Sequence, residues 1–313
     1  KSNKSDSYDI RYQGSVFTDA TWKVAFGLNY NHSFDDGYAY HAVDSLKAHR
    51  YRVNYNADAS YKRDLLSTYV NIQKHFSQTL LNWITSYSRA KDKQVLDADF
   101  TYHDVFQNEK ESKQDLITQE INYQSSQGEK IDWTLGTFGF YKDLTNDYLA
   151  TFGTERHLLL PLDLDQASYY NNTSTWGIAG YGQVTVKNLL PGMFVTSGIR
   201  YDYEKASLSY RDSLLFHDAD QFTGYHDWDE NHSYAAWLPK FSILQKWNEQ
   251  LSTYLNISKG YKAGGYNIIS NEMTTQVVEL EYGKESLWNY ELGAKYFSAN
   301  GRFNLNGALF YID

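Results

Sequence analysis

Residues 22–34 read Trp22-Lys23-Val24-Ala25-Phe26-Gly27-Leu28-Asn29-Tyr30-Asn31-His32-Ser33-Phe34. Every second residue, starting at the tryptophan, is apolar or aromatic, with one histidine among them, and the residues between are small, polar or charged. Successive side chains of a β-strand point to opposite faces, so this stretch predicts a strand with one apolar face and one polar face. The same alternation returns in 193–204, 288–297 and 302–312.

Two properties set these stretches apart from the strands of a soluble sandwich, which would also alternate. Their polar face carries Gly, Asn, Ser and charged side chains, and each runs for about ten residues or more. The chain is also rich in residues that favour membrane–water interfaces, with 29 Tyr and 8 Trp. We therefore expect an all-β fold, an antiparallel transmembrane β-barrel with lipid outside and a polar interior.

Composition excludes several other classes of protein. No stretch approaches the length of about 18 apolar residues that a membrane-spanning helix needs. Cysteine is absent, so disulfide and thiol chemistry is excluded, and the formal net charge of −9 argues against nucleic-acid binding. There is no basic segment followed by an apolar one at the start, so no signal peptide is expected. Because the sequence stops inside an alternating strand, at Tyr311-Ile312-Asp313, we interpret 1–313 as one partial barrel domain of a longer protein.

The alternation predicts roughly twelve or thirteen strands, joined by connections of two kinds. The predicted strands are 8–17, 22–34, 48–61, 67–76, 80–90, 114–125, 131–143, 176–187, 193–208, 235–246, 251–263, 287–298 and 302–313. Short connections with turn residues fall at 18–21, 126–130, 188–192, 247–250 and 299–301. Long polar connections fall at 35–47, 91–113, 144–175, 209–234 and 264–286.

From residue 114 onward the short and long connections alternate strictly. A barrel with short periplasmic turns and long extracellular loops has this order. Between 48 and 90 the alternation is lost, because three predicted strands follow one another through short turns. Either one of those strands is wrong or one extracellular loop is short.

Three segments in order resemble the TonB-dependent outer-membrane receptors. The first is Ser258-Lys259-Gly260-Tyr261-Lys262-Ala263-Gly264-Gly265-Tyr266-Asn267, and the second is Trp288-Asn289-Tyr290-Glu291-Leu292-Gly293-Ala294-Lys295. An Asn-Gly turn and the strand 302–313 follow, and Leu96-Asp97-Ala98-Asp99-Phe100 upstream is also similar to iron-complex receptors of this kind. The resemblance covers residues 67 to 313 and implies part of a barrel of about 22 strands that surrounds an N-terminal plug.

The resemblance implies a transport function in the outer membrane of a Gram-negative bacterium. Receptors of this family capture a scarce small molecule, most often a ferric siderophore, and a TonB complex in the inner membrane drives its release through the plug. This sequence shows neither a plug nor a TonB box, so energy coupling is assigned to no residue. We expect outer-membrane lipid, the ligand and, through an N-terminal region, the TonB complex as partners, with no cofactor and no nucleic acid.

The long connection 216–234 and the start of the next one hold the residues we predict to bind the ligand. They are His217, His226, Trp228, His232 and Tyr266. Aromatic rings supply contact area, and protonated histidines contact anionic groups. A net acidic loop favours a neutral or cationic iron complex over a strongly anionic one. A solvated acidic loop explains the same residues without any ligand, and their spacing matches neither an EF-hand nor HExxH, so no metal site is predicted.

Glycines and charges near the resemblance motifs have structural interpretations. Gly260, Gly264 and Gly265 lie where a strand meets its loop, which suggests positive φ or close backbone approach rather than a phosphate-binding loop. On the polar strand faces, the pairs Arg200 with Asp202 and Glu291 with Lys295 would line the interior, where pairing among themselves or with a plug is favoured over ligand contact. No nucleophile motif stands out, so no enzyme is predicted.

Two alternatives remain open at this point. A passive porin-like channel would share the alternation and the aromatic belts, but not the three resemblance segments. A soluble β-protein that binds glycans would share the strands, but it does not explain large apolar side chains on one side of so many of them.

Overall fold

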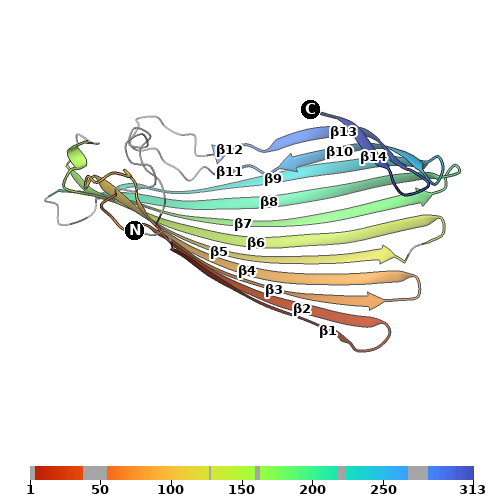
Figure 1. The fold of residues 1–313 in the computed structure, drawn as a ribbon, viewed down its shortest axis with the longest axis horizontal. Helices are drawn as coiled ribbons and strands as arrows, with labels where there is room; N and C mark the ends of the chain where they lie inside the picture. Colours follow the sequence, from red (N-terminus) through yellow and green to blue (C-terminus); the bar gives the residue numbers. More distant parts are fainter. Residues whose placement is uncertain are drawn as a thin grey trace.

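The computed structural model describes residues 4–37, 55–126, 128–158, 163–217, 221, 223–266 and 281–313, with residues 223–226 described by their backbone alone. It contains one 12-stranded antiparallel sheet and a separate two-stranded sheet (Figure 1). The large sheet comprises β1 (Lys4–Phe17), β2 (Trp22–Asp36), β3 (Ser60–His75), β4 (Thr79–Asp97), β5 (Phe106–Ser125), β6 (Ile131–Phe152), β7 (Leu164–Lys187), β8 (Met193–Phe216), β9 (Thr223–Lys246), β10 (Leu251–Lys262), β13 (Glu285–Phe297) and β14 (Asn304–Ile312). The small sheet pairs β11 (Gly265–Tyr266) with β12 (Glu281–Tyr282), and η2 (Arg156–Leu158) is a 3-10 turn.

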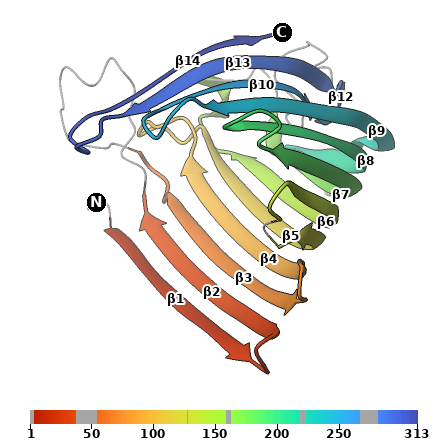
Figure 2. The same cartoon turned by 90° about the vertical axis from the view of Figure 1, so that its right-hand side faces the viewer.

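The large sheet is a meander that curls into an open trough. Its strands are neighbours in space in the order in which they occur along the chain, with β10 followed by β13. Figure 2 shows the curl from β1 at one edge to β14 at the other. This is the up-and-down arrangement of a barrel wall, and it bears out the predicted antiparallel fold. None of the helical residues in the described part forms a segment long and apolar enough to cross a membrane.

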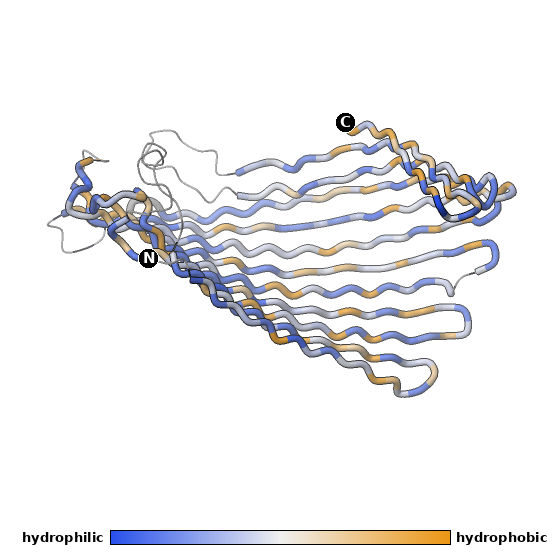
Figure 3. Tube along the Cα trace, in the orientation of Figure 1, coloured by the Kyte–Doolittle hydropathy of each residue, from blue (hydrophilic) through white to orange (hydrophobic). Residues whose placement is uncertain are grey.

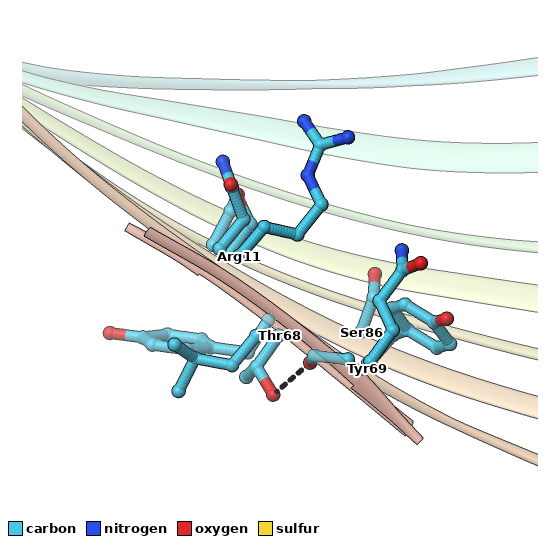
Figure 4. Close-up of a pocket in the computed structure, with 11 residues that line it drawn as sticks. Arg11, Thr68, Tyr69 and Ser86 are labelled. Carbon is cyan, nitrogen blue, oxygen red and sulfur yellow. Dashed lines mark hydrogen bonds between the residues drawn. The ribbon is translucent and has the colours of Figure 1, made fainter. Parts of the chain in front are cut away.

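The two faces of the trough differ in chemistry, as the alternation predicts. Figure 4 shows Arg11 and Ser86 on the concave side and Thr68 on the convex side. Strand register then places the row Val24, Ile72 and Trp83 on the convex side, where Trp83 is 43% exposed. Hydrophobic and hydrophilic residues are interleaved along the strands in Figure 3. The apolar face therefore lies outside, where lipid surrounds a barrel.

Aromatic residues mark two levels on the convex face. Near the short turns, the rings of Tyr123 and Trp133 pack 5.2 Å apart. Toward the other end, Trp176, the register partner of Tyr141, packs against Tyr203 at 5.6 Å. Along β6, Trp133 and Tyr141 lie about 27 Å apart at about 3.4 Å per residue. Two such levels correspond to the aromatic girdles that flank the apolar band of an outer-membrane barrel.

Within the described residues, the strand ends joined by short turns lie at one end of the trough, and the strand ends that lead into the long connections lie at the other (Figure 1). The connections within 144–175 and 209–234 therefore share one end, and the turn 299–301 lies at the opposite end, as predicted. Two of the short turns contain a glycine with positive φ, Gly192 at 75° and Gly301 at 68°. At Gly192 a Cβ would lie 2.2 Å from the Lys246 carbonyl oxygen, so the turn requires glycine.

The predicted strand 48–61 is wrong in its described part. Residues 55–59 are not a strand, residues 48–54 lie outside the described ranges, and β3 begins only at Ser60. With this strand removed, one long connection joins β2 to β3, and the alternation of short and long connections holds throughout the described sheet. Of the two explanations left open by the sequence, a wrong strand is the correct one.

The long connections were predicted too long, because four strands extend far into them. β6 has 22 residues and β7, β8 and β9 have 24 each, whereas about 9–11 residues suffice to cross a membrane. Backbone pairing continues past the membrane, where the outer face no longer has to be apolar. The clear hydrophobic alternation ends there, although the strands do not. The predicted loop 209–234 is accordingly mostly β8 and β9.

Candidate functional site

Four aromatic rings form a ladder across the concave face near the long connections. They are Tyr148, Tyr169, Tyr210 and Trp228, one on each of β6, β7, β8 and β9. Successive ring centroids lie 4.5, 6.4 and 4.4 Å apart, with interplanar angles of 11°, 18° and 24°. Tyr210 is only 1% exposed. The ladder is a row of stacked rings that the register of four strands holds in place, with Trp228 at its β9 end.

A cavity of about 380 Å³ lies at the β9 end of the ladder. Its lining residues are Leu208, Trp228, Glu230, Tyr266 and Glu281. The first three share one concave patch, because Leu208 pairs with Glu230 in the register of β8 and β9, two residues along from the Tyr210–Trp228 pair. β11 and β12 supply the other two. The volume is within the range of about 300–1,000 Å³ that is typical of small-molecule sites.

Two glycines allow the small β11–β12 sheet to pack against the wall. A Cβ at Gly264 would lie 2.5 Å from the Tyr282 carbonyl oxygen and 2.6 Å from the Tyr234 ring, and one at Gly265 would lie 2.6 Å from the Tyr282 hydroxyl. Neither residue has positive φ. Of the two roles predicted for these glycines, close approach is therefore correct and positive φ is wrong. Their compactness brings Tyr266 and Glu281 to the cavity.

Some polar groups around the cavity have no hydrogen-bond partner among the described residues. His232 Nδ1 lies 2.5 Å from Glu281 Oε1, at ion-pair distance but without the alignment of a hydrogen bond, and the His232 ring stacks 6.1 Å from that of Tyr266. The hydroxyls of Tyr234 and Tyr266 are buried without a hydrogen-bond partner among the described residues. Burial raises the pKa of Tyr266 to about 12, so this hydroxyl keeps its proton and can donate a hydrogen bond to an acceptor.

Three of the five predicted ligand-binding residues come together at this cavity. Trp228 and Tyr266 line it, and His232 contacts both Tyr266 and Glu281. His217 follows the end of β8 and lies with Nδ1 3.2 Å from Asp165, outside the cavity lining. The backbone of His226 is part of β9, and its side chain lies outside the described residues. Trp228 and His232 belong to a strand, which corrects their predicted position in a loop.

The sequence interpretation missed Leu208, Tyr210 and Glu281. A signal for the first two existed, since Ala206, Leu208 and Tyr210 recur at every second position with serines between them. They lie on the face that is polar in 196–202, so the apolar period changes face there and the predicted strand ends at residue 208. Glu281 has no such signal, because β12 contains only two residues. Its position depends on the packing of β11 and β12 against the wall.

The part of the concave face nearer the short turns carries charges that pair with their neighbours. Arg200 donates to both Asp202 oxygens at 2.7 Å, which confirms the pairing expected for these two residues. Glu291 accepts a hydrogen bond of 2.6 Å from the Tyr254 hydroxyl, and the Lys295 ammonium lies 5.8 Å from the centroid of the same tyrosine ring. These residues thus meet through a tyrosine rather than directly.

A second concave pocket, of about 260 Å³, lies on β1–β4 (Figure 4). Its walls are mostly small and hydroxylic, with Ser67, Ser86 and Ser88 facing Asn29, and Arg11 extends from its edge toward the interior. Tyr69 and Tyr87 also line it, but it has no stacked aromatic ladder and none of the buried unpaired hydroxyls of the first cavity. The cavity beside Trp228 is therefore the better candidate for ligand capture.

Carboxylates fasten the connection 98–105 to its neighbour 153–163. Asp104 accepts hydrogen bonds of 2.9 Å from the Thr154 amide and hydroxyl, and these hold the pKa of Asp104 below its ordinary value. Glu155 in turn accepts bonds of 2.9 Å from the Asp104 amide and from His103, which lower the pKa of Glu155. This end of the trough is thus tied together by ionised side chains.

No group of three or more His, Asp or Glu side chains in the described part of the chain is placed to hold a metal ion. The described residues supply rings, hydroxyls and two carboxylates to the cavity, which suit contacts with an organic molecule.

Comparisons with known proteins agree with this architecture. A family model described as TonB dependent receptor-like, β-barrel, matches residues 1–313. The chain is 24% identical over 177 residues to the pesticin receptor of Yersinia enterocolitica, a match that covers 56% of this chain and 23% of that receptor. It thus spans about a quarter of that relative's length.

Solved structures show the same fold. The ferric yersiniabactin uptake receptor FyuA from Yersinia pestis superimposes with a TM-score of 0.77 at 18% identity, covering 99% of this chain and 45% of that one. The siderophore receptor PiuA from Acinetobacter baumannii gives a TM-score of 0.69 at 11% identity, covering 98% and 50%. The chain thus corresponds to about half of each of these proteins.

Proposed function

Because this chain belongs to the TonB-dependent receptor β-barrel family, we propose that it is part of a receptor that takes up a ferric siderophore or another iron complex. Members of this family are transporters in the outer membrane of Gram-negative bacteria, not enzymes. They bind small molecules such as siderophores and interact with TonB. Membership sets aside the passive porin and the soluble glycan-binding protein as alternatives.

The observation that supports ligand capture in this chain is the cavity beside Trp228. It lies on the concave side, at the end of the trough that has the long connections, where a molecule arriving from outside would first meet the wall. The aromatic ladder offers flat apolar surface, and the buried hydroxyls of Tyr234 and Tyr266 need an acceptor. Convergent polar groups in an aromatic pocket are typical of small-molecule sites.

The charges of the cavity favour a neutral or cationic iron complex. Glu230 and Glu281 both line it, and His232 is the cationic side chain beside them when protonated. A strongly anionic complex would lose its hydration and meet these carboxylates at close range, which disfavours binding. Tyr266 can still donate one hydrogen bond to a ligand oxygen.

The same proposal assigns the remaining partners of the receptor. Lipid of the outer membrane surrounds the convex face, and energy coupling comes from a TonB complex through parts of the receptor outside residues 1–313. We treat these residues as one contiguous piece of the barrel wall. The ligand, the coupling partner and the membrane are properties of the whole receptor.

Uptake of radioactive iron tests this function in cells that carry the full-length receptor. We expect accumulation from at least one neutral or cationic ferric siderophore, and loss of that accumulation in cells without TonB. Replacing both cavity carboxylates, with Glu230→Gln and Glu281→Gln together, should shift preference toward anionic complexes. Uptake that does not depend on TonB, or no uptake of any iron complex by correctly assembled receptor, would contradict the proposal.

A further inference from the structure

The convex face is not uniformly filled with large side chains. On adjacent strands β7, β8 and β9, the outward positions Gly182, Ser197 and Pro239 are compact. Gly182 and Pro239 are the register partners of Ile199 on either side, and Ser197 lies two residues before Ile199 on the same strand. Three compact residues therefore surround one isoleucine and leave a depression in the outer surface.

This depression is a groove of about 760 Å³ with apolar walls. Leu135 and Val184 border it on one side, and Phe241, Ile257 and Trp288 border it on the other. The cross-strand row of Val184, Ser197, Phe241 and Ile257 establishes that these walls belong to the convex face. Trp133 belongs to this same row, and the Tyr201–Trp237 pair lies one convex row beyond Ile199, toward the long connections.

The occupant of a groove at this height must be hydrocarbon. Water is absent from the apolar band of a membrane. An empty depression there would leave its wall atoms without van der Waals contacts. A second copy of this chain would need a protruding partner surface, whereas an acyl chain can follow a groove of any direction. The volume of about 760 Å³ leaves room for an acyl chain.

A cation lies where the head of such a lipid would be. The ammonium of Lys259 is 6.0 Å from the centroid of the Trp288 ring, at the end of the groove toward the long connections. A lysine beside an interfacial tryptophan places its charge at the level of lipid phosphates. Apolar walls and one cation thus match the two halves of a phosphorylated lipid.

We propose that this groove binds one acyl chain of a phosphate-bearing lipid from the leaflet on the side of the long connections, with Lys259 facing its phosphate. The site is separate from the ligand cavity, because it lies on the opposite face of the wall. Its lipid would be retained through purification, unlike the freely exchanging lipids around it.

Native mass spectrometry of the full-length receptor, released from outer membranes in mild detergent, tests the proposal. We expect one tightly held phosphorylated lipid on the wild type, its loss in Ser197→Phe, and weaker retention in Lys259→Gln. Thr85→Phe adds the same ring to the convex face of β4, far from the groove, and should keep the lipid. If Ser197→Phe fails to assemble, Ser197→Leu replaces it in the experiment. Its smaller side chain also fills the groove, so this variant should release the lipid as well.

Three results would overturn the proposal. The first is a wild-type receptor without bound lipid, and the second is lipid equally retained in Ser197→Phe and Thr85→Phe. The third is a dimer that only the groove variants dissociate, because it would identify the groove as an interface between copies.

Discussion

Tyr210 and Trp228 face each other from neighbouring strands, with ring centroids 4.4 Å apart and planes inclined by 24°. The pair ends an aromatic ladder, and its Trp228 lines the cavity that we assign to the ligand, with Tyr210 buried beside it. Since the register of β8 and β9 fixes both residues, the aromatic surface exists before any ligand arrives.

Replacing Trp228 with alanine should weaken binding of the iron complex by tenfold or more, because truncating a central tryptophan in a binding site costs about 2 kcal/mol. Equilibrium binding to the purified full-length receptor measures the change. Trp237→Ala serves as the control, since this tryptophan is on the same strand but faces outward, 60% exposed. Equal affinities for the two variants would remove Trp228 from the site. Deleting residues 217–232 is unsuitable, because it would remove part of β9.

Tyr266→Phe separates ligand binding from stability. The buried hydroxyl has no partner among the described residues, so its removal should leave the thermal stability of the free receptor unchanged or slightly higher. If the hydroxyl donates to the ligand, affinity should fall several-fold, corresponding to about 1 kcal/mol for one hydrogen bond. A variant with lower stability and normal affinity would show that the hydroxyl serves the fold alone.

Gly264→Ala should lower ligand affinity without preventing barrel assembly. The added methyl group would lie 2.5 Å from the Tyr282 carbonyl oxygen, so β11 and β12 must move and carry Tyr266 and Glu281 with them. Gly283→Ala is a matched control, because its Cβ would meet no atom within 4 Å. Binding titrations and heat-modifiable migration on gels measure the two properties. The same loss of affinity in both variants would argue against a role for this packing.

Acidification should release the connection 98–105 from residues 153–155. The pKa values of Asp104 and Glu155 are lowered by hydrogen bonds that only the folded state provides. Their contribution to stability is therefore present above the ordinary carboxyl pKa of about 4 and is lost as pH falls through the lowered values. Amide exchange at Thr154 should lose protection at that pH, while Thr151 in β6 stays protected. Unchanged protection at Thr154 well below pH 4 would contradict this assignment.

Leu255→Arg should destabilise the barrel in lipid vesicles by about 2–4 kcal/mol, because the side chain lies on the convex face within the apolar band. Its register partners Ile243 and Leu292 form an apolar row across β9, β10 and β13. Asn256→Arg places the same charge on the concave face, opposite Glu291, and should be tolerated. The reverse order of effects would mean that the two faces are exchanged.

The sequence predicted the membrane-crossing part of the fold well, because lipid demands an apolar outer face and thereby imprints alternation on strands such as 22–34. It failed where that demand ends. The strand predicted at 48–61 is wrong over residues 55–59, and the continuation of β8 and β9 through 209–234 was interpreted as a loop. Backbone pairing maintains these extensions with polar and charged outer residues, so the apolar period of the outer face ends before the strands do.

The sequence predicted those residues of the candidate site that stand out by their side-chain type within one short segment. Trp228, His232 and Tyr266 stood out by type, and the glycines before Tyr266 suggested close packing. The absence of His217 from the cavity, and the contribution of Glu281, depend on how strands and connections distant in sequence meet. Single-sequence patterns do not record such contacts.

The position of the iron atom in a crystal of the full-length receptor with its ferric ligand tests the central claim most directly. Anomalous scattering at the iron absorption edge locates that atom independently of the quality of the ligand density. We predict a single strong peak on the concave side, within contact distance of a ligand that touches Trp228 and Tyr266. A peak on the opposite wall of the barrel, with this cavity unoccupied, would contradict the account.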